Sequence, residues 1–554
     1  MPARITWVAP LRDGIPTPAE NGAHSAPSRC RATVTQRRSS IVLIVLALAA
    51  LSCGEAEASS PLELVVDTRA RSRPISPYIY GVNGLELTAG NDLFTLLRFG
   101  GTRVSTYNWE NNASNAGHDP PHHQNDGYLC ESTTPGGAVL RVLDRARELG
   151  AAALVQVPLI GHVAADRRAD GDVSQTPGYL EARFCRSLAR GGGEAPSLDD
   201  HVVHQDAFVR FVRREAERRS VPVFFALDNE PGGWPVTHPR LREGRHPTYR
   251  ELARASVEHA RMIHEEAPRT QVFGPVSFGW PDMRDLAGAP DARGRHFLRF
   301  YLSAMRAAER RHGRRIFDVL DVHWYPASNV GGEPVSSGAD DPERARLRMQ
   351  LPRSLYDPSF REPSFIVDDD LDAPIELLPR LTRLIRDAYP GTRLAITEYA
   401  YGGAEHPSGA VAQADALGAF GRHGVYAASY WPLTGQGHTY ALAAFRMFRR
   451  VDGEVSFGDR SIPATSSDLS RLSAWASLDS QHPGRVVIVL VGRAERDTHA
   501  RLIVRGGPRG PARRFVLDRE GPRPREEGSI TPREGAYRVP LPARSVTTLI
   551  LDPV

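Results

Sequence analysis

Residues 223–231 read VFFALDNEP, and this stretch decides the fold. The run is too apolar for a strand with one solvent-facing side, so it fits a parallel sheet that is buried on both faces. A charged residue, Glu230, appears only at the carboxyl end. A second stretch, RLAITEYAYGG from Arg393, repeats the pattern and carries Glu398 at its end. Parallel barrels place their chemistry at this end of the strands, so both glutamates are candidate functional residues.

Eight strands are predicted in all, and helical stretches separate them. One such helix is Ala138–Leu149, stopped by Gly150, and a capping box at Thr248 and Glu251 opens another. Eight parallel βα units predict a (β/α)8 barrel. A doubly wound open sheet is disfavoured because no Gly-rich dinucleotide loop follows the first strand. The predicted strands are Tyr78–Asn83, Leu97–Thr106, Ala151–Pro158, Val223–Asp228, Gln271–Val276, Phe317–His323, Leu394–Glu398 and Tyr426–Trp431.

The pattern changes after about Ala441 to short strands separated by Gly, Pro and Arg, which is typical of an antiparallel sandwich. Leu62–Asp67 alternates in the same way and is expected to complete that sandwich. We therefore predict a leader over 1–58, a sandwich strand within 59–76, a barrel over 77–440 and a sandwich over 441–554. Two long irregular stretches, Gly161–His204 and Ala327–Pro374, are expected to be loops that shape the barrel mouth. The predicted C-terminal strands are Leu472–Leu478, Val486–Val491, Ala500–Val504, Phe515–Asp518 and Ser545–Leu551.

Composition limits the possible functions. The chain has 554 residues, 41% of them apolar, which is enough for a substantial core. Its 69 basic residues nearly balance its 65 acidic ones, so no nucleic-acid or acidic-membrane partner is indicated. Every basic residue is arginine. The absence of lysine excludes Schiff-base chemistry, a pyridoxal lysine and a phosphate-loop lysine together.

The N-terminal region reads as an export signal. Two arginines precede Ile41–Leu51, an apolar run too short to cross a bilayer but suited to a signal peptide. Ala56-Glu57-Ala58 fits a cleavage site, and Cys53 is a candidate for lipid attachment instead. The polar, Pro-rich first 33 residues suggest that translation starts near Val34. We expect an exported protein that is secreted, periplasmic or anchored at the cell surface.

Two cysteines and one histidine-rich loop are also candidates for a disulfide or a metal site. Cys130 and Cys185 either pair in an oxidising compartment or stay as free thiols, and two thiols alone fall short of a structural zinc site. A cluster in the loop after the second strand invites a metal hypothesis, but two prolines within it break any helical ligand spacing. We predict no metal there. The cluster is His118, Asp119, His122 and His123.

Paired carboxylates at a barrel mouth are the minimal equipment for breaking a glycosidic bond with retention of configuration. One carboxylic acid protonates the departing oxygen, and a carboxylate about 5–5.5 Å away attacks the anomeric carbon. Glu230 suits the acid/base role, and the adjacent amide of Asn229 suits the sugar 2-hydroxyl. Glu398 suits the nucleophile, and the phenol of Tyr325 or Tyr399 is expected to keep it ionised.

Two further strand ends are expected to complete the site. His323 is predicted to lie between the two carboxylates, and Trp431 is predicted to form a platform under the reacting sugar. Each residue alone has an ordinary structural interpretation, because an NEP triplet is a weak motif and most histidines and tryptophans pack in cores. Together, at the ends of strands that count to eight, they favour the functional interpretation.

Several long motifs resemble glycoside hydrolase family 44, which comprises endoglucanases and xyloglucanases. The resemblance runs from about Tyr78 to Leu433 and implies a barrel joined to a β-sandwich, cleavage within β-1,4-glucan chains, and no redox cofactor. On this pattern Glu230 corresponds to the acid/base and Glu398 to the nucleophile. Ala400 departs from the pattern, since a polar residue is expected there. The matching motifs are RFGGTRVSTYNWENNASNAG, LDNEPGGWPVTHP, DVHWYP, SLYDPSF and TEYAYGG.

Other residues match motif positions without a catalytic role. Asn229 is one, and four more are expected to line the cleft or brace it: Tyr107, Trp109, Glu110 and Asn111. A polymer lying across the barrel mouth needs stacking surfaces, and the candidates are Trp109, Trp234, Trp280 and Trp324.

The function expected from these observations is a retaining endo-acting hydrolase of β-1,4-glucans, both cellulose-type glucan and xyloglucan. The expected partner is the polysaccharide alone, with no cofactor and no protein partner. A xylanase or mannanase with the same carboxylates is the first alternative. A non-catalytic carbohydrate-binding or adhesion protein on a barrel scaffold is the second.

Overall fold

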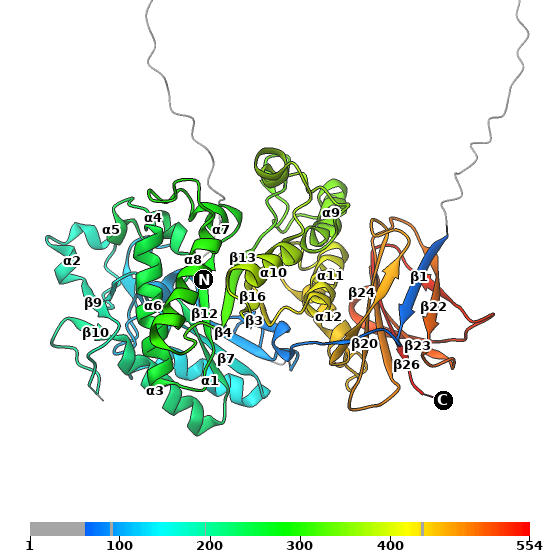
Figure 1. Ribbon diagram of the computed structural model, residues 1–554, viewed down its shortest axis with the longest axis horizontal. Coiled ribbons are helices and arrows are strands. Elements are labelled where there is room, and N and C mark those ends of the chain that lie inside the picture. The colour runs from blue at the N-terminus through cyan, green and yellow to red at the C-terminus, as the bar shows by residue number, and fades with distance from the viewer. Residues whose placement is uncertain (1–60, 89–91, 194, 434–436, 554) are drawn as a thin grey trace, which may run out of the picture. The chain divides into compact units, whose positions relative to one another are not determined.

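The computed structural model describes residues 61–88, 92–193, 195–433 and 437–553. Its larger part is a closed barrel of eight parallel strands that neighbour one another in chain order (Figure 1). All eight predicted strands are confirmed. The first two are shorter than predicted, because Pro77–Ile79 and Thr102–Thr106 form 3-10 turns, η1 and η2. The barrel strands are β3 (Gly81–Asn83), β4 (Leu96–Phe99), β7 (Ala152–Val157), β11 (Val223–Leu227), β12 (Val272–Ser277), β13 (Val319–Trp324), β16 (Arg393–Tyr399) and β17 (Ala427–Tyr430).

Helices connect these strands from the second strand onward. The predicted helix before Gly150 is α1, and Gly150 ends it in the left-handed conformation. The capping box at Thr248 and Glu251 opens α6 as predicted. Between β3 and β4 the described residues contain no helix. The long helices are α1 (Gly137–Leu149), α3 (Gln205–Arg219), α6 (Tyr249–Glu266), α8 (Phe297–His312), α10 (Leu377–Ala388), α11 (Pro407–His423) and α12 (Thr439–Phe448).

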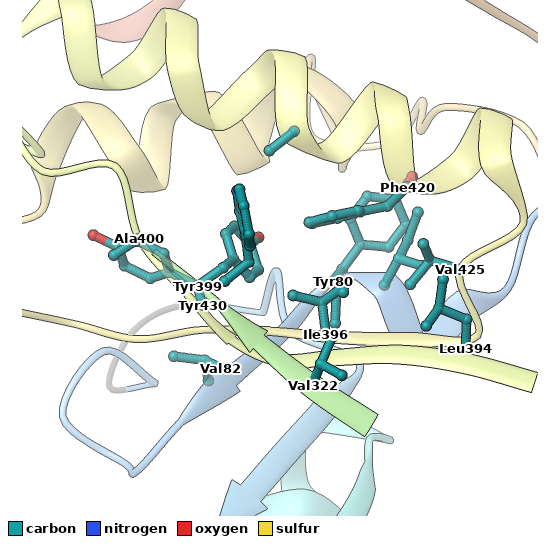
Figure 2. Packing of buried hydrophobic residues seen from close by; sticks show 14 of the residues in the cluster. Tyr80, Val82, Val322, Leu394, Ile396, Tyr399, Ala400, Phe420, Val425 and Tyr430 are labelled. Atoms are coloured by element: carbon teal, nitrogen blue, oxygen red, sulfur yellow. The ribbon is translucent and has the colours of Figure 1, made fainter. Parts of the chain in front are cut away.

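Two apolar layers hold the barrel together. Inside it, residues such as Leu154, Ala226 and Ala395 form one buried cluster. Outside it, strand residues pack against the helices, and Figure 2 shows this layer where Ile396 and Tyr399 of β16 lie near Phe420 of α11. The rings of Tyr399 and Phe420 meet edge to face at 5.0 Å. Alternate residues of each strand therefore serve the two layers.

A bulge in β16 changes which way Glu398 points. Val322 of β13 pairs with Ile396, but the next residue, His323, pairs with Glu398, so Thr397 is an extra residue. Without the bulge, Ile396 and Glu398 would face the same outer layer, because side chains alternate along a strand. The extra residue turns Glu398 toward the barrel mouth, and Tyr399 therefore packs against α11.

The two stretches predicted to be irregular loops contain their own secondary structure, so that prediction is wrong in detail. Gly161–His204 holds a small sheet. Its strands have only three to five residues, which is too short to give a clear periodic signal. Ala327–Pro374 holds a two-stranded ribbon and short helices. The elements are β8 (His162–Ala164), η3 (Val173–Gln175), α2 (Tyr179–Ala182), β9 (Phe184–Leu188) and β10 (Val202–His204), then β14 (Asn329–Val330), β15 (Glu333–Pro334), α9 (Pro342–Gln350), η5 (Leu351–Leu355) and η6 (Ile366–Leu371).

Short elements also occur in the loops after other strands. They are β5 (Ser114–Asn115) and β6 (Asn125–Asp126) after β4, η4 (Pro231–Gly233), α4 (Trp234–Thr237) and α5 (Pro239–Arg242) after β11, and α7 (Trp280–Asp285) after β12. All of them follow the carboxyl ends of barrel strands. They therefore surround the end of the barrel at which Glu230 and Glu398 lie.

The C-terminal part is a β-sandwich of a four-stranded and a seven-stranded sheet. All five predicted C-terminal strands are present, and β1 (Leu62–Asp67) joins the sandwich as predicted, beside β22 (Figure 1). Its other neighbour is β19. The proposed boundary at 441 falls inside α12. The other strands are β2 (Arg73–Pro74), β18 (Arg460–Ile462), β19 (Ala464–Ser466), β20 (Leu472–Leu478), β21 (Val486–Gly492), β22 (Thr498–Arg505), β23 (Ala512–Asp518), β24 (Gly521–Ile530), β25 (Tyr537–Leu541) and β26 (Ser545–Leu551).

Three sequence predictions bear on the N-terminus and the thiols. The predicted leader, with Cys53 and the cleavage site, lies outside the described residues. Within them, the structure contains no helix with the length and apolar character needed to span a membrane. Cys130 and Cys185, whose pairing the sequence left open, are both buried free thiols.

Candidate active site

Glu230 and Glu398 meet at the mouth of the barrel, with His323 between them. His323 Nδ1 lies 2.7 Å from Glu230 Oε1 and 3.4 Å from Glu398 Oε2. One oxygen of each carboxylate and the histidine nitrogen all lie within 4.8 Å of one another. All three side chains are almost fully buried. The placement of His323 between the carboxylates agrees with the prediction from its strand end.

The turn after β11 is held in a strained conformation. Asp228 and Glu230 both adopt left-handed backbone angles, with φ of 62° and 48°, which non-glycine residues rarely do. The buried carboxylate of Asp228 stabilises this turn, because it accepts hydrogen bonds from the amides of Asn229 and Ile160 at 2.8 and 3.0 Å. Ser105 Oγ donates to the same carboxylate at 2.5 Å. The turn thereby fixes where Glu230 projects.

Arg98 is the residue of this site that the sequence interpretation missed. It lies in β4 within the apolar run LLRF and is 1% exposed. Its Nη1 donates to Glu398 Oε1 at 2.6 Å and to Asn83 Oδ1 at 2.8 Å, while Nη2 donates to Asn229 Oδ1 at 2.6 Å. A charged residue inside a buried strand is the signal that identifies such a position.

The two carboxyls differ in how readily they lose a proton. Burial raises the pKa of Glu398, but the guanidinium of Arg98 and the hydroxyl of Tyr325, which donates to Oε2 at 3.0 Å, oppose that rise. Burial and then the charge of Glu398 raise the pKa of Glu230 well above its ordinary value. Burial also lowers the pKa of His323 well below its ordinary value, so the imidazole is neutral. Glu230 is therefore the carboxyl that holds the proton, and Glu398 is the one with cationic support.

Of the two phenols considered as partners of Glu398, only Tyr325 contacts it among the described residues. Tyr399 is buried on the other side of β16, where its hydroxyl accepts a hydrogen bond from Gln413 Nε2 at 2.7 Å. Of the two alternatives that the sequence left open, the contacts match Tyr325 and exclude Tyr399. The β16 bulge explains the difference, because the extra residue turns Glu398 toward the mouth, and the next residue, Tyr399, then faces outward.

Trp431 follows the end of β17 and is half-buried. Its ring lies so close to Gly101 that a Cβ added there would come within 3.1 Å of the indole. Gly101 also has a φ of 109°, which favours glycine for a second reason. The backbone amide of Trp431 donates to Tyr399 O at 3.0 Å, which ties the backbone at Trp431 to β16.

The other tryptophans proposed as stacking surfaces are all buried, so that expectation is wrong. Trp109 packs against Phe208 and Phe211, and Trp324 is 1% exposed. Trp234 Nε1 donates to Asn229 O at 3.2 Å, and Trp280 Nε1 donates to Asp370 Oδ2 at 3.0 Å. Strand-end and loop tryptophans look alike in sequence, but the contacts show that Trp109, Trp234 and Trp280 hold loops in place, while Trp324 is buried at the end of β13.

Three motif residues near Trp109 lie in the loop after β4, and two of them brace it. Tyr107 donates through its hydroxyl to Asn112 Oδ1 at 2.6 Å, and Asn111 Nδ2 donates to Ala165 O at 2.9 Å. Glu110 lines a small cavity of about 100 Å³ next to Asp200, and burial raises the Glu110 pKa to about 7. Of the two roles that the sequence left open, the contacts of Tyr107 and Asn111 match bracing, whereas Glu110 lines a cavity.

The histidine-rich loop does not assemble a ligand set. Neighbouring rings of His118, His122 and His123 lie 5.7 and 6.3 Å apart. Across the described residues, the single group of three or more donors close enough to hold a metal ion is Glu230, His323 and Glu398. Arg98 already neutralises Glu398 there.

A parallel barrel with two unlike carboxyls at its mouth is the arrangement of the (β/α)8-barrel glycoside hydrolases. The model of "Glycoside hydrolase family 44" matches residues 109–328. A xyloglucanase structure of that family from Paenibacillus polymyxa, solved with xyloglucan, superposes with a TM-score of 0.83 at 33% identity. That similarity covers 89% of this chain and 100% of the other. This protein belongs to glycoside hydrolase family 44.

Two curated proteins are also similar. Endoglucanase A of Paenibacillus lautus is 35% identical over 460 residues, which are 79% of this chain and 64% of the relative. Beta-mannanase/endoglucanase A of Caldicellulosiruptor saccharolyticus is 33% identical over 467 residues, which are 78% of this chain and 34% of the relative. The chain thus spans less than two thirds of the length of either curated relative.

Proposed function

We propose that this protein is a retaining endo-acting glycoside hydrolase that cleaves β-1,4-glucan backbones. The observation that carries the proposal is the pair Glu230 and Glu398, with an oxygen of each within 4.8 Å of the other and only one of them paired with arginine. Retaining glycosidases hold their carboxyls about 5–5.5 Å apart, whereas inverting ones leave about 6.5–9.5 Å for a water. The short separation supports direct attack.

The roles follow from the environments of the two groups. Glu398, ionised beside Arg98 and Tyr325, attacks the anomeric carbon and forms a glycosyl–enzyme bond. Glu230, which holds its proton, donates that proton to the departing glycosidic oxygen. Glu230 then removes a proton from water, which attacks the anomeric carbon and releases Glu398. The configuration is inverted twice and therefore retained.

Neighbouring groups orient the substrate. Arg98 donates a hydrogen bond to the carbonyl oxygen of the Asn229 side chain. The amide NH2 of Asn229 therefore remains as a donor for a sugar hydroxyl. Neutral His323 lies against Glu230 and sets the direction of its carboxyl. Half-buried Trp431, which follows the end of β17, is the platform for the reacting sugar ring.

The family relatives support a glucan substrate, since their names are endoglucanase and xyloglucanase. Mannan is the second candidate, because one relative is named a mannanase as well. Reducing-end release should be measured on carboxymethyl cellulose, xyloglucan, xylan and glucomannan. We expect the highest rates on the two glucans. A preference for xylan or glucomannan would indicate a xylanase or a mannanase instead. Binding without release of reducing ends would favour a non-catalytic carbohydrate-binding protein.

We also propose that the protein is exported. The support lies in the sequence, where the apolar run Ile41–Leu51 follows two arginines, and Cys53 is a candidate site for lipid attachment. Expression of the full chain in a bacterial host, followed by mass analysis of the mature N-terminus, tests both ideas. Cleavage after Ala58 would indicate a freely secreted protein, and a lipid-modified Cys53 would indicate an anchored one.

A further inference from the structure

Glu362 is a buried carboxylate that no catalytic step uses. It is 1% exposed, and its two oxygens bind groups from different segments. Oε1 accepts a hydrogen bond from Ala327 N at 3.2 Å, and Oε2 accepts one from Ser354 Oγ at 2.6 Å. None of the ion pairs found among the described residues includes Glu362. A carboxylate buried without a cation is costly, so stability alone does not account for it.

The segment that Glu362 holds carries a residue of the active site. Ala327 lies two residues after Tyr325, and only Pro326 separates them. Proline fixes its own φ and restricts the residue before it to extended conformations. Few backbone torsions therefore remain between the amide held by Glu362 and the phenol that donates to Glu398 at 3.0 Å.

The second group that Glu362 binds, Ser354, belongs to a firmly held part of the fold. Ser354 belongs to η5, and the next residue after η5, Tyr356, donates through its hydroxyl to Asp415 Oδ2 at 3.1 Å. Asp415 lies in α11 and forms a fully buried ion pair with Arg493. Glu362 thus connects the short segment after β13 to a part of the fold that is fixed by buried charges.

We propose that Glu362 is a positioning residue that holds Tyr325 in hydrogen-bond contact with the nucleophile Glu398. This inference rests on the proposed function. A carboxylate suits the task because it only accepts hydrogen bonds, while Ala327 N and Ser354 Oγ both donate. Loss of the hydrogen bonds that Glu362 accepts lets Tyr325 move. The ionised form of Glu398 then loses one of its two stabilising donors, Tyr325 and Arg98.

The test compares pH profiles of kcat/KM for the full chain on its best soluble polysaccharide. Glu362→Gln keeps the size but replaces one acceptor oxygen with a donor. Tyr325→Phe removes the hydroxyl itself. Both variants should move the acidic limb toward higher pH by about one unit, the size expected for a lost hydrogen bond to a charged group. The double variant should move it no further than Tyr325→Phe alone.

Asp357→Asn is the matched control. Asp357 is equally buried in the same segment, but it binds Arg353 at 2.7 Å. We expect the control to lower the melting temperature without moving the acidic limb. The inference is overturned if the acidic limb of the pH profile does not shift in Glu362→Gln or does not shift in Tyr325→Phe. It is also overturned if the two shifts add in the double variant.

A second variant covers the case in which Glu362→Gln fails to fold. Ser354→Ala removes one donor and leaves Glu362 and Ala327 in place, and it should move the limb in the same direction by a smaller amount. No movement there overturns the inference. The rate of the unaltered protein on the polysaccharides judges the proposed function separately, so the two failures are distinguishable.

Discussion

Replacing Arg98 by Gln removes the one cation that contacts the proposed nucleophile among the described residues. Arg98 Nη1 lies 2.6 Å from Glu398 Oε1, and both side chains are almost fully buried. A hydrogen bond to a charged group contributes about 1.5–3 kcal/mol, and one pKa unit corresponds to about 1.36 kcal/mol. The pKa of Glu398 should therefore rise by about one to two units in the variant.

The sign of the effect on activity follows from the role of Glu398. The carboxyl must be ionised to attack, and arginine favours the ionised form. Without Arg98, a larger fraction of Glu398 is protonated at low pH. The acidic limb of the kcat/KM profile therefore shifts to higher pH by about one to two pH units. On the plateau above that limb a smaller loss should remain, because Asn229 also loses its partner.

The assay is the initial rate of reducing-end release across the pH range, with thermal melts to confirm folding. Arg103→Gln is the control, since Arg103 is also buried but pairs with Asp126 at 2.8 Å. It removes the same charge away from both carboxylates and should leave the limb in place. A folded Arg98→Gln enzyme whose acidic limb stays where it was would refute the reasoning.

Three further predictions concern the carboxyls. Glu398→Ala should abolish turnover of the polymer, and added azide with an activated β-glycosyl fluoride should yield an α-azide; a first-formed α-anomer from the intact enzyme, seen by NMR, would contradict direct attack. Glu230→Ala should spare substrates with good leaving groups, so equal losses on an activated aryl glycoside and on the polymer would remove its acid role. Burial raises the pKa of Asp321 to about 7. The unfolded chain releases that proton near pH 4, so the native state loses stability as pH rises from about 4 to about 7. Asp321→Asn cannot ionise, and its melting temperature relative to the parent should increase over that interval; a constant difference would disprove the shift.

The barrel could be predicted because its strands are buried on both faces. Runs such as that of β11 show this directly, and the charged residue at the end marks the functional edge. Local sequence was sufficient for Glu230, Glu398 and His323, because each lies at a strand's carboxyl end and eight strands bring those ends together. The strand ends also placed Trp431 at the mouth.

What the sequence could not provide depends on contacts between distant residues. Arg98 and Glu398 are 300 residues apart, and only the closed barrel brings their strands into range. The bulge at Thr397 determines that Tyr399 faces α11. No residue type in β16 indicates a bulge, so the sequence did not predict this orientation. The four buried tryptophans were misassigned for a related reason, since burial of a residue in a loop or at a strand end depends on which loops cover it.

The position of β1 in the sandwich has a consequence for the order in which the protein is made. β1 is an inner strand of its sheet, yet its neighbours β19 and β22 leave the ribosome only after the whole barrel. Glu63 of β1 and Arg501 of β22 are 438 residues apart, and closing a loop of that length costs about 5 kcal/mol of chain entropy. Among the described residues, β1 is the first strand to be synthesised, and it must therefore remain unpaired until the barrel is complete. A nascent chain that stalls within the barrel would carry an apolar strand with two open edges, which is a template for aggregation.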